Sequence, residues 1–116
     1  MKEIRKALKL SKIKYFETHL ALINCILPKK LTPMEIKVLA AFMSLEGDIA
    51  QYRFGPSAKK IIMSQLDLKP AGLSNYITSL LNKGFLIKKG DIIEILAILI
   101  PENETQLYMF KLVNEG

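Results

Sequence analysis

The chain has 116 residues, of which 50% are hydrophobic and 24% charged, and its formal net charge is +6 at pH 7. This length and composition predict one folded domain and exclude a disordered chain, while the excess of basic residues favours a polyanionic partner. The single cysteine, Cys25, excludes a disulfide framework or a cysteine-based zinc site within one chain and predicts a reducing compartment.

Residues 1–30 are expected to form a basic arm followed by an apolar helix that contributes to dimerisation. Basic side chains recur at helical spacing in the first part, which favours an amphipathic helix, with a disordered arm as the alternative. These residues are Lys2, Arg5, Lys6, Lys9 and Lys12. From Tyr15 to Leu27 the pattern is mostly apolar, which predicts a helix buried against the domain or against a second copy. Pro28 ends that helix.

Three features of this region bear on location and chemistry. His19 is expected to be a satisfied core or interface residue, and Cys25 a small buried hydrophobe. The apolar run over residues 20–28 is too short to span a bilayer, and lysines rather than a small-residue cleavage site follow it. We therefore expect a cytoplasmic protein with no membrane partner.

The next segment carries a strong helix start. Thr32, Pro33 and Glu35 form the pattern of a capping box with proline in the first turn, and the predicted helix runs to Met43. A loop over residues 46–48 ends it. A short strand over residues 52–54 and a helix over residues 58–65, started by Gly55-Pro56-Ser57, are expected to follow.

The following part predicts a turn at residues 66–68 and a helix over residues 70–82 that buries Leu73, Ile77 and Leu80. Gly84 supplies a left-handed cap after that helix. The pattern then predicts a strand over residues 85–88, a turn, a strand or a helix over residues 92–100, a polar loop, and a last strand over residues 106–113.

Four short motifs in residues 31–90 resemble winged helix-turn-helix regulators, especially those of the multiple-antibiotic-resistance class. The matching segments are Leu31-Thr32-Pro33-Met34-Glu35 with Val38-Leu39, Leu66-Asp67-Leu68-Lys69, Leu73-Ser74-Asn75, and Leu80 with Gly84-Phe85-Leu86. The resemblance implies a mainly α fold with a small β wing, here with an N-terminal helical extension (residues 1–30) before the winged domain (residues 31–116). Related domains occur in replication and phage proteins, and some bind only protein.

The resemblance places the helix over residues 70–82 in the major groove of double-stranded DNA. Ser74, Asn75 and Thr78 would then read base edges from an exposed face that also includes Ser79 and Asn82. No lysine or arginine lies between Pro70 and Asn82, so phosphate contacts must come from flanking lysines. The candidates are Lys59, Lys60, Lys69, Lys83, Lys88 and Lys89.

Two functions remain open. The first is a DNA-binding transcription regulator or replication-type factor, expected to be a homodimer. The second is a protein-interaction or assembly module, such as a phage structural or connector component in a virion, which the uncharged helix favours. No Gly-rich phosphate loop, zinc-ligand spacing or nucleophile motif is present in the sequence, so we expect no enzymatic activity, cofactor or metal.

Overall fold

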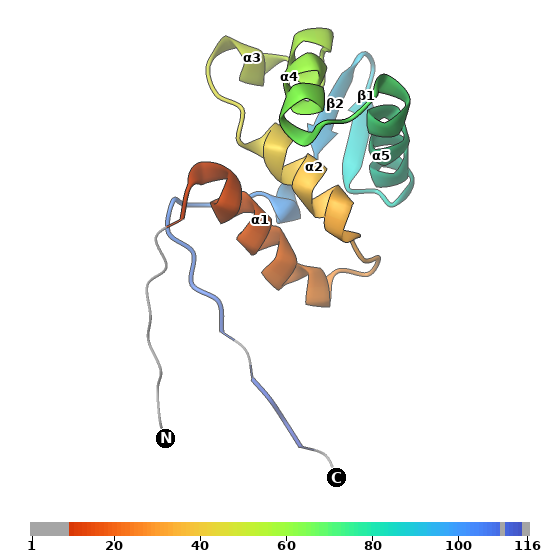
Figure 1. Cartoon of the computed structure of the whole chain (residues 1–116). Coiled ribbons are helices and arrows are strands. Elements are labelled where there is room, and N and C mark those ends of the chain that lie inside the picture. The colour runs from red at the N-terminus through yellow and green to blue at the C-terminus, as the bar shows by residue number, and fades with distance from the viewer. Residues whose placement is uncertain (1–9, 110, 115–116) are drawn as a thin grey trace.

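Five α-helices precede a two-stranded sheet in the computed structural model, which describes residues 10–109 and 111–114 (Figure 1). The α-helices are α1 (Lys12–Ile23), α2 (Pro33–Met43), α3 (Asp48–Gln51), α4 (Pro56–Leu66) and α5 (Pro70–Asn82). The strands are β1 (Leu86–Lys89) and β2 (Ile92–Ile95), and short 3₁₀ helices are η1 (Asn24–Ile26) and η2 (Ala97–Leu99). The expected mainly α fold with a small β wing is confirmed.

Local capping determines where the first two long helices begin. The Thr32 hydroxyl accepts a 3.2 Å bond from the Glu35 amide, and the Glu35 carboxylate accepts a 2.8 Å bond from the Thr32 amide. This confirms the predicted capping box. α1 begins before the predicted Tyr15, since the Ser11 hydroxyl accepts from the Lys14 amide and starts the helix at Lys12.

α4 and α5 are joined by a tight turn. Asp67 adopts a left-handed conformation (φ 53°), which aspartate tolerates better than most residues. The Leu68 amide donates a 2.9 Å bond to the Met63 carbonyl and closes the turn. The expected left-handed glycine after α5 is confirmed at Gly84 (φ 82°), and the chain passes directly from it into β1.

The wing is the antiparallel hairpin of β1 and β2. Its register pairs Leu86 with Ile95 and Lys89 with Ile92, and Gly90 turns the chain with a φ of 62°. For residues 92–100 the sequence predicted either a strand or a helix. The structure has strand β2 followed by the short helix η2 and no continuous element.

Two predicted strands are wrong. Residues 52–54 form turns after the unexpected short helix α3, with the Tyr52 carbonyl accepting a 2.8 Å bond from the Gly55 amide. Residues 106–109 and 111–113 form neither helix nor strand. A composition rich in β-formers does not make a strand unless another strand lies beside it to complete the hydrogen bonds.

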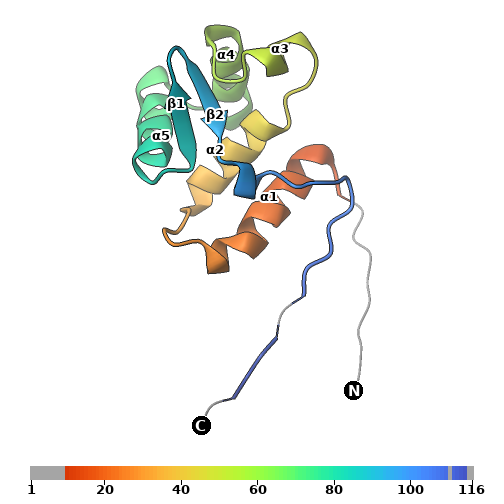
Figure 2. The same ribbon diagram turned by 180° about the vertical axis from the view of Figure 1, so that it is seen from behind.

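One hydrophobic core joins the N-terminal helix to the rest of the domain. Its largest fully buried side chains come from six elements or their flanks and include Leu20, Phe42, Ile62, Leu80, Phe85 and Leu99. Figure 2 shows the chain leaving the sheet, passing along α1 and then running away from the helices. α1 is therefore packed against the domain, which is one of the two placements expected for it.

Candidate nucleic-acid interface

α5 presents a polar, uncharged face to the surroundings. The predicted base readers Ser74, Asn75 and Thr78 are all exposed, as is Asn82 one turn later. These positions are three or four residues apart and lie along one side of the helix. The predicted core residues Leu73, Ile77 and Leu80 are buried on the other side, so the expected orientation of α5 is confirmed.

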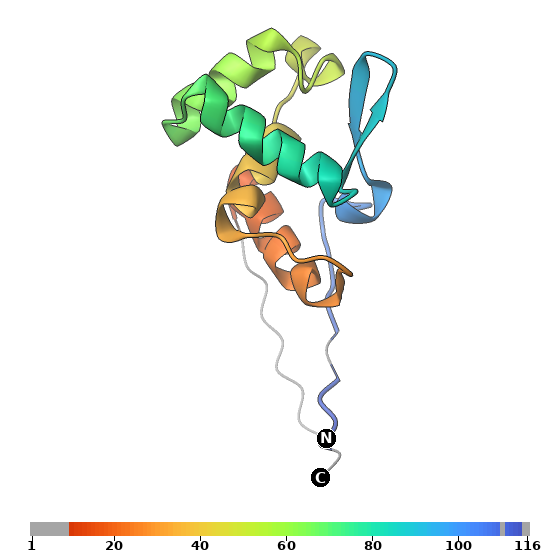
Figure 3. The same cartoon turned by 90° about the vertical axis from the view of Figure 1, so that its right-hand side faces the viewer.

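The surrounding elements hold α5 at both ends. Figure 3 shows α4 meeting one end of α5 and the wing rising beyond the other end. Lys69 is the residue that precedes α5, and the half-buried ring of Tyr76 packs against the core. The exposed face of α5 is therefore presented by a helix whose axis is restrained by the core.

The flanking lysines differ in their availability for an external anion. Lys60, Lys69 and Lys88 are exposed and form no ion pair within residues 10–109 and 111–114, and Lys59 is half-buried and likewise unpaired there. Lys89 lies 3.0 Å from the Glu94 carboxylate, with both side chains largely exposed. Such a surface pair contributes little stability, so Lys89 can exchange it for a phosphate.

Lys83 has a different environment from the other five lysines. Its ammonium group donates to the Glu35 carboxylate at 2.6 Å and to the Lys30 carbonyl at 2.9 Å. Glu35 is buried on α2, so the ion pair links α2 to the end of α5. Lys83 therefore neutralises a carboxylate inside the domain, and we leave it out of the proposed phosphate contacts.

Ser79 takes part in the same cluster and is not on the exposed face where the sequence placed it. It is partly buried, and its hydroxyl donates a 2.6 Å bond to Glu35. Burial raises the pKa of Glu35, but bonds from Lys83, Ser79 and the Thr32 amide outweigh that effect and lower the pKa overall. Glu35 is consequently ionised at neutral pH, and its carboxylate accepts bonds from the Thr32 amide, the Ser79 hydroxyl and the Lys83 ammonium group.

The basic arm falls mostly outside the described residues. Lys2, Arg5, Lys6 and Lys9 lie there, whereas Lys12 is in the first turn of α1 and forms an ion pair with Glu46. The sequence prediction for the arm therefore stays a prediction. The Lys12 pair ties the start of α1 to the loop that follows α2.

Arg53 is a structural residue that the sequence interpretation missed. Its guanidinium donates a 2.6 Å bond to the Phe42 carbonyl at the end of α2 and a longer one to the Leu45 carbonyl. Burial lowers its pKa. A basic side chain satisfying the last carbonyls of a helix is a known capping arrangement, but here it comes from a distant loop and has no local sequence signal.

His19 and Cys25 both lie on the N-terminal helical segment, but only His19 is buried. His19 is buried, as expected, with one ring nitrogen bonded to the Tyr108 hydroxyl and the other 3.0 Å from the Leu99 carbonyl. Cys25 is exposed in η1, so its predicted burial is wrong. The helix α1 ends at Ile23, and the change to a tighter 3₁₀ turn moves Cys25 away from the core.

Within the described residues, no group of three or more His, Cys, Asp or Glu side chains is placed to hold a metal ion. In the same part of the chain, no helix combines the length and apolar character needed to cross a bilayer.

Comparison with known proteins adds no family assignment. No protein-family model, no curated protein and no solved structure matches this chain.

Proposed function

We propose that this protein binds double-stranded DNA by placing α5 in the major groove, as a homodimeric transcription regulator or replication-type factor of the cytoplasm. The observation that carries the proposal is the exposed polar face of α5, with exposed lysines before it at Lys69 and after it at Lys88. A helix of this kind fits the width of the major groove. Lysines at its two ends can reach the phosphates that border the groove.

Base recognition would depend on amide and hydroxyl groups. Asn75 can donate to and accept from adenine in a bidentate arrangement, while Ser74 and Thr78 can bond to several base edges. No arginine or lysine of α5 is available for the common bidentate contact with guanine. We therefore propose a modest preference for sites with A·T pairs opposite Asn75.

Affinity would come mainly from charge outside α5. Lys60 on α4, Lys69 before α5 and Lys88 on β1 are exposed and form no ion pair with any residue that the structure describes, and we assign them to phosphates. Each phosphate contact releases condensed counterions and makes the affinity depend more steeply on salt. The half-buried Lys59 and the paired Lys89 are secondary candidates.

The deciding experiment is a duplex titration of the full chain by fluorescence anisotropy at several salt concentrations. Lys69→Ala and Lys88→Ala should each weaken binding and lower the slope of log affinity against log salt by about one. Lys37→Ala is the matched control, since Lys37 is exposed on α2 two positions from Glu35 and therefore points away from the face that meets α5.

Absence of duplex binding by the intact chain at low salt would overturn the proposal. Equal losses in the Lys37 control and the two test variants would also overturn it, because a general charge effect would then explain the binding. A variant lacking residues 1–9 separates the arm from the domain, because α1 begins at Lys12 after its cap at Ser11. Loss of all binding in that variant alone would show a nonspecific tether instead of groove recognition by α5.

The second candidate is a protein-interaction or assembly module, of the kind found in viral structural components. It is favoured by one observation: α5 carries no charged residue from Pro70 to Asn82, which is unusual for a helix that enters a polyanionic groove. Under this alternative, α5 contacts a protein surface and the duplex titration above gives no binding.

A further inference from the structure

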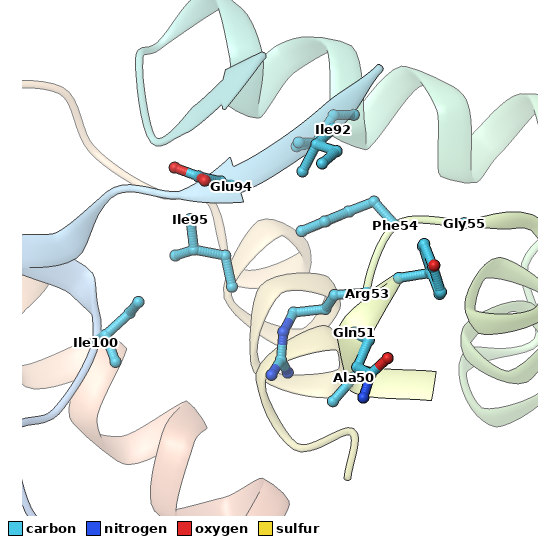
Figure 4. Close-up of a pocket in the computed structure, with 11 residues that line it drawn as sticks. Ala50, Gln51, Arg53, Phe54, Gly55, Ile92, Glu94, Ile95 and Ile100 are labelled. Atoms are coloured by element: carbon cyan, nitrogen blue, oxygen red, sulfur yellow. The ribbon is translucent and has the colours of Figure 1, made fainter. Parts of the chain in front are cut away.

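A groove lies between the outer side of the wing and the turn after α3. It has a volume of about 450 Å³ and is lined largely by apolar side chains, among them Phe54, Ile92 and Ile95. Figure 4 shows Phe54 and Arg53 on one side of the groove and Ile92 and Ile95 of β2 on the other. This is the place where the sequence predicted an additional strand and where the structure has a turn instead.

The edge of β2 that borders the groove is unpaired. In the part of the chain that the structure describes, β2 pairs only with β1. The Leu96 amide donates to the Phe85 carbonyl, and bonded positions alternate along an antiparallel pair, so Leu96, Glu94 and Ile92 face β1. The backbone groups of Ile93 and Ile95 therefore point outward and are available to a third strand.

The C-terminal segment carries apolar side chains that are exposed. Met109, Leu112 and Val113 are 89%, 97% and 64% exposed, although their side chains are apolar. Together with Lys111 they belong to a short segment, residues 109–113, in which four of the five residues are apolar and Phe110 and Val113 are of types that favour strands. An apolar segment of this kind gains free energy when a sheet edge and an apolar surface cover it.

Contacts with α1 place the start of the C-terminal segment away from the groove of the same copy. Tyr108 is bonded to His19 of α1, and the Tyr15 hydroxyl donates a 2.8 Å bond to the Asn103 carbonyl. These contacts attach the chain to α1 immediately before residue 109. Figures 1 and 3 show residues 111–114 lying away from the sheet. Docking in the groove of the same copy would require the chain to reverse its direction after Tyr108.

We infer that residues 109–113 of one copy add to the free edge of β2 in a second copy, forming a third strand in its groove. Five extended residues span about 17 Å, enough to cover a four-residue strand. The charge of Lys111 is opposite to that of Glu94, which lines the groove and forms only a largely exposed surface pair with Lys89 that Lys111 can replace. If both copies exchange their segments, the result is a closed, symmetric dimer. This inference does not depend on DNA binding.

The first test measures the mass of the full chain by light scattering over a range of concentrations. The wild type should form a dimer, and Leu112→Asp should raise the dimer dissociation constant tenfold or more, on the order expected for one buried leucine. Leu112 is almost fully exposed in the single copy, so the substitution leaves the fold unchanged. Ile26→Asp is the matched control, because Ile26 is 73% exposed on η1, outside both surfaces.

A wild type that remains monomeric at all concentrations would overturn the inference, as would equal effects of the two substitutions. A second test locates the contact. In a Cys25→Ser background, protein carrying Tyr52→Cys at the groove is mixed with protein carrying Leu112→Cys and treated with a short bis-maleimide. Cross-linked heterodimers support the inference. Cross-links that form only between two Leu112→Cys chains would show pairing of the C-terminal segments with each other and overturn it.

Discussion

The ammonium group of Lys83 lies 2.6 Å from the carboxylate of Glu35, although the two residues are 48 positions apart in the chain. Glu35 is buried and caps the start of its own helix, while Lys83 directly follows α5. The pair therefore connects the end of the candidate DNA-reading helix to the helix behind it. It also distinguishes Lys83 from Lys60, Lys69 and Lys88, which are exposed and form no ion pair within the described part of the chain.

Replacing Glu35 by glutamine should lower the free energy of unfolding by about 2 kcal/mol, because the ammonium group of Lys83 then lacks a counterion in a largely buried place. Urea denaturation followed by circular dichroism at neutral pH measures this change. Glu94→Gln removes an exposed pair with Lys89 and should cost less than about 0.5 kcal/mol. Similar losses in the two variants would contradict the assignment of Glu35 to a buried link.

Glu35 should also contribute to the loss of stability in acid. Its pKa in the folded state is below its ordinary value of 4.5, so the unfolded state binds more protons between the two values. The contribution is fully present above pH 4.5 and is lost as the pH falls through the lower, folded pKa. The urea midpoint of Glu35→Gln should therefore fall less steeply with acid than that of the wild type. Parallel pH profiles would exclude this contribution.

His19 should titrate below its ordinary pKa of about 6.5. Burial lowers its pKa, and the bond to the Leu99 carbonyl opposes that effect only in part. Stability from the neutral ring is present above about pH 6.5 and is lost as the pH falls through the folded pKa. His19 is the only histidine of the chain, so one imidazole resonance in proton NMR reports it. The urea-unfolded chain is the reference, and an equal or higher pKa in the folded protein would contradict the prediction.

Asn75→Ala should reduce the discrimination between preferred and non-preferred duplexes by about 1–3 kcal/mol while leaving the salt slope unchanged. The reason is that Asn75 is an exposed amide that can pair with adenine and carries no charge. Competition binding against a randomised duplex pool measures the change. Asn82→Ala, one exposed amide further along α5, tests whether the effect is specific to the start of the helix. Uniform weakening on every duplex would assign Asn75 to the DNA backbone instead.

Local signals explain why most helices could be predicted. The capping box at Thr32, the prolines at the starts of α2, α4 and α5, and the glycine after α5 act through neighbouring residues only. Their effects on the backbone do not depend on distant parts of the chain. The spacing of Leu73, Ile77 and Leu80 likewise predicted which side of α5 is buried.

Strand predictions failed where no second strand lies alongside. Tyr52-Arg53-Phe54 and the C-terminal segment have suitable side chains, yet the first is held in turns and the second has no neighbouring strand in the described structure. Strand formation depends on long-range pairing, which a single segment does not encode. The same reason made residues 92–100 ambiguous until the register with β1 was known.

The sequence by itself determined the helix starts, the buried side of α5, the absence of charge on that helix and the number of lysines around it. Only the tertiary structure decided which of those lysines are free, because the partner of Lys83 lies on another helix and is brought near by packing of the core. It also decided that, among the described residues, one edge of β2 is unpaired and the apolar side chains of Met109, Leu112 and Val113 are exposed. Helix boundaries arise from interactions within one turn, whereas the partners of charged groups and strand edges depend on residues that are distant in the chain.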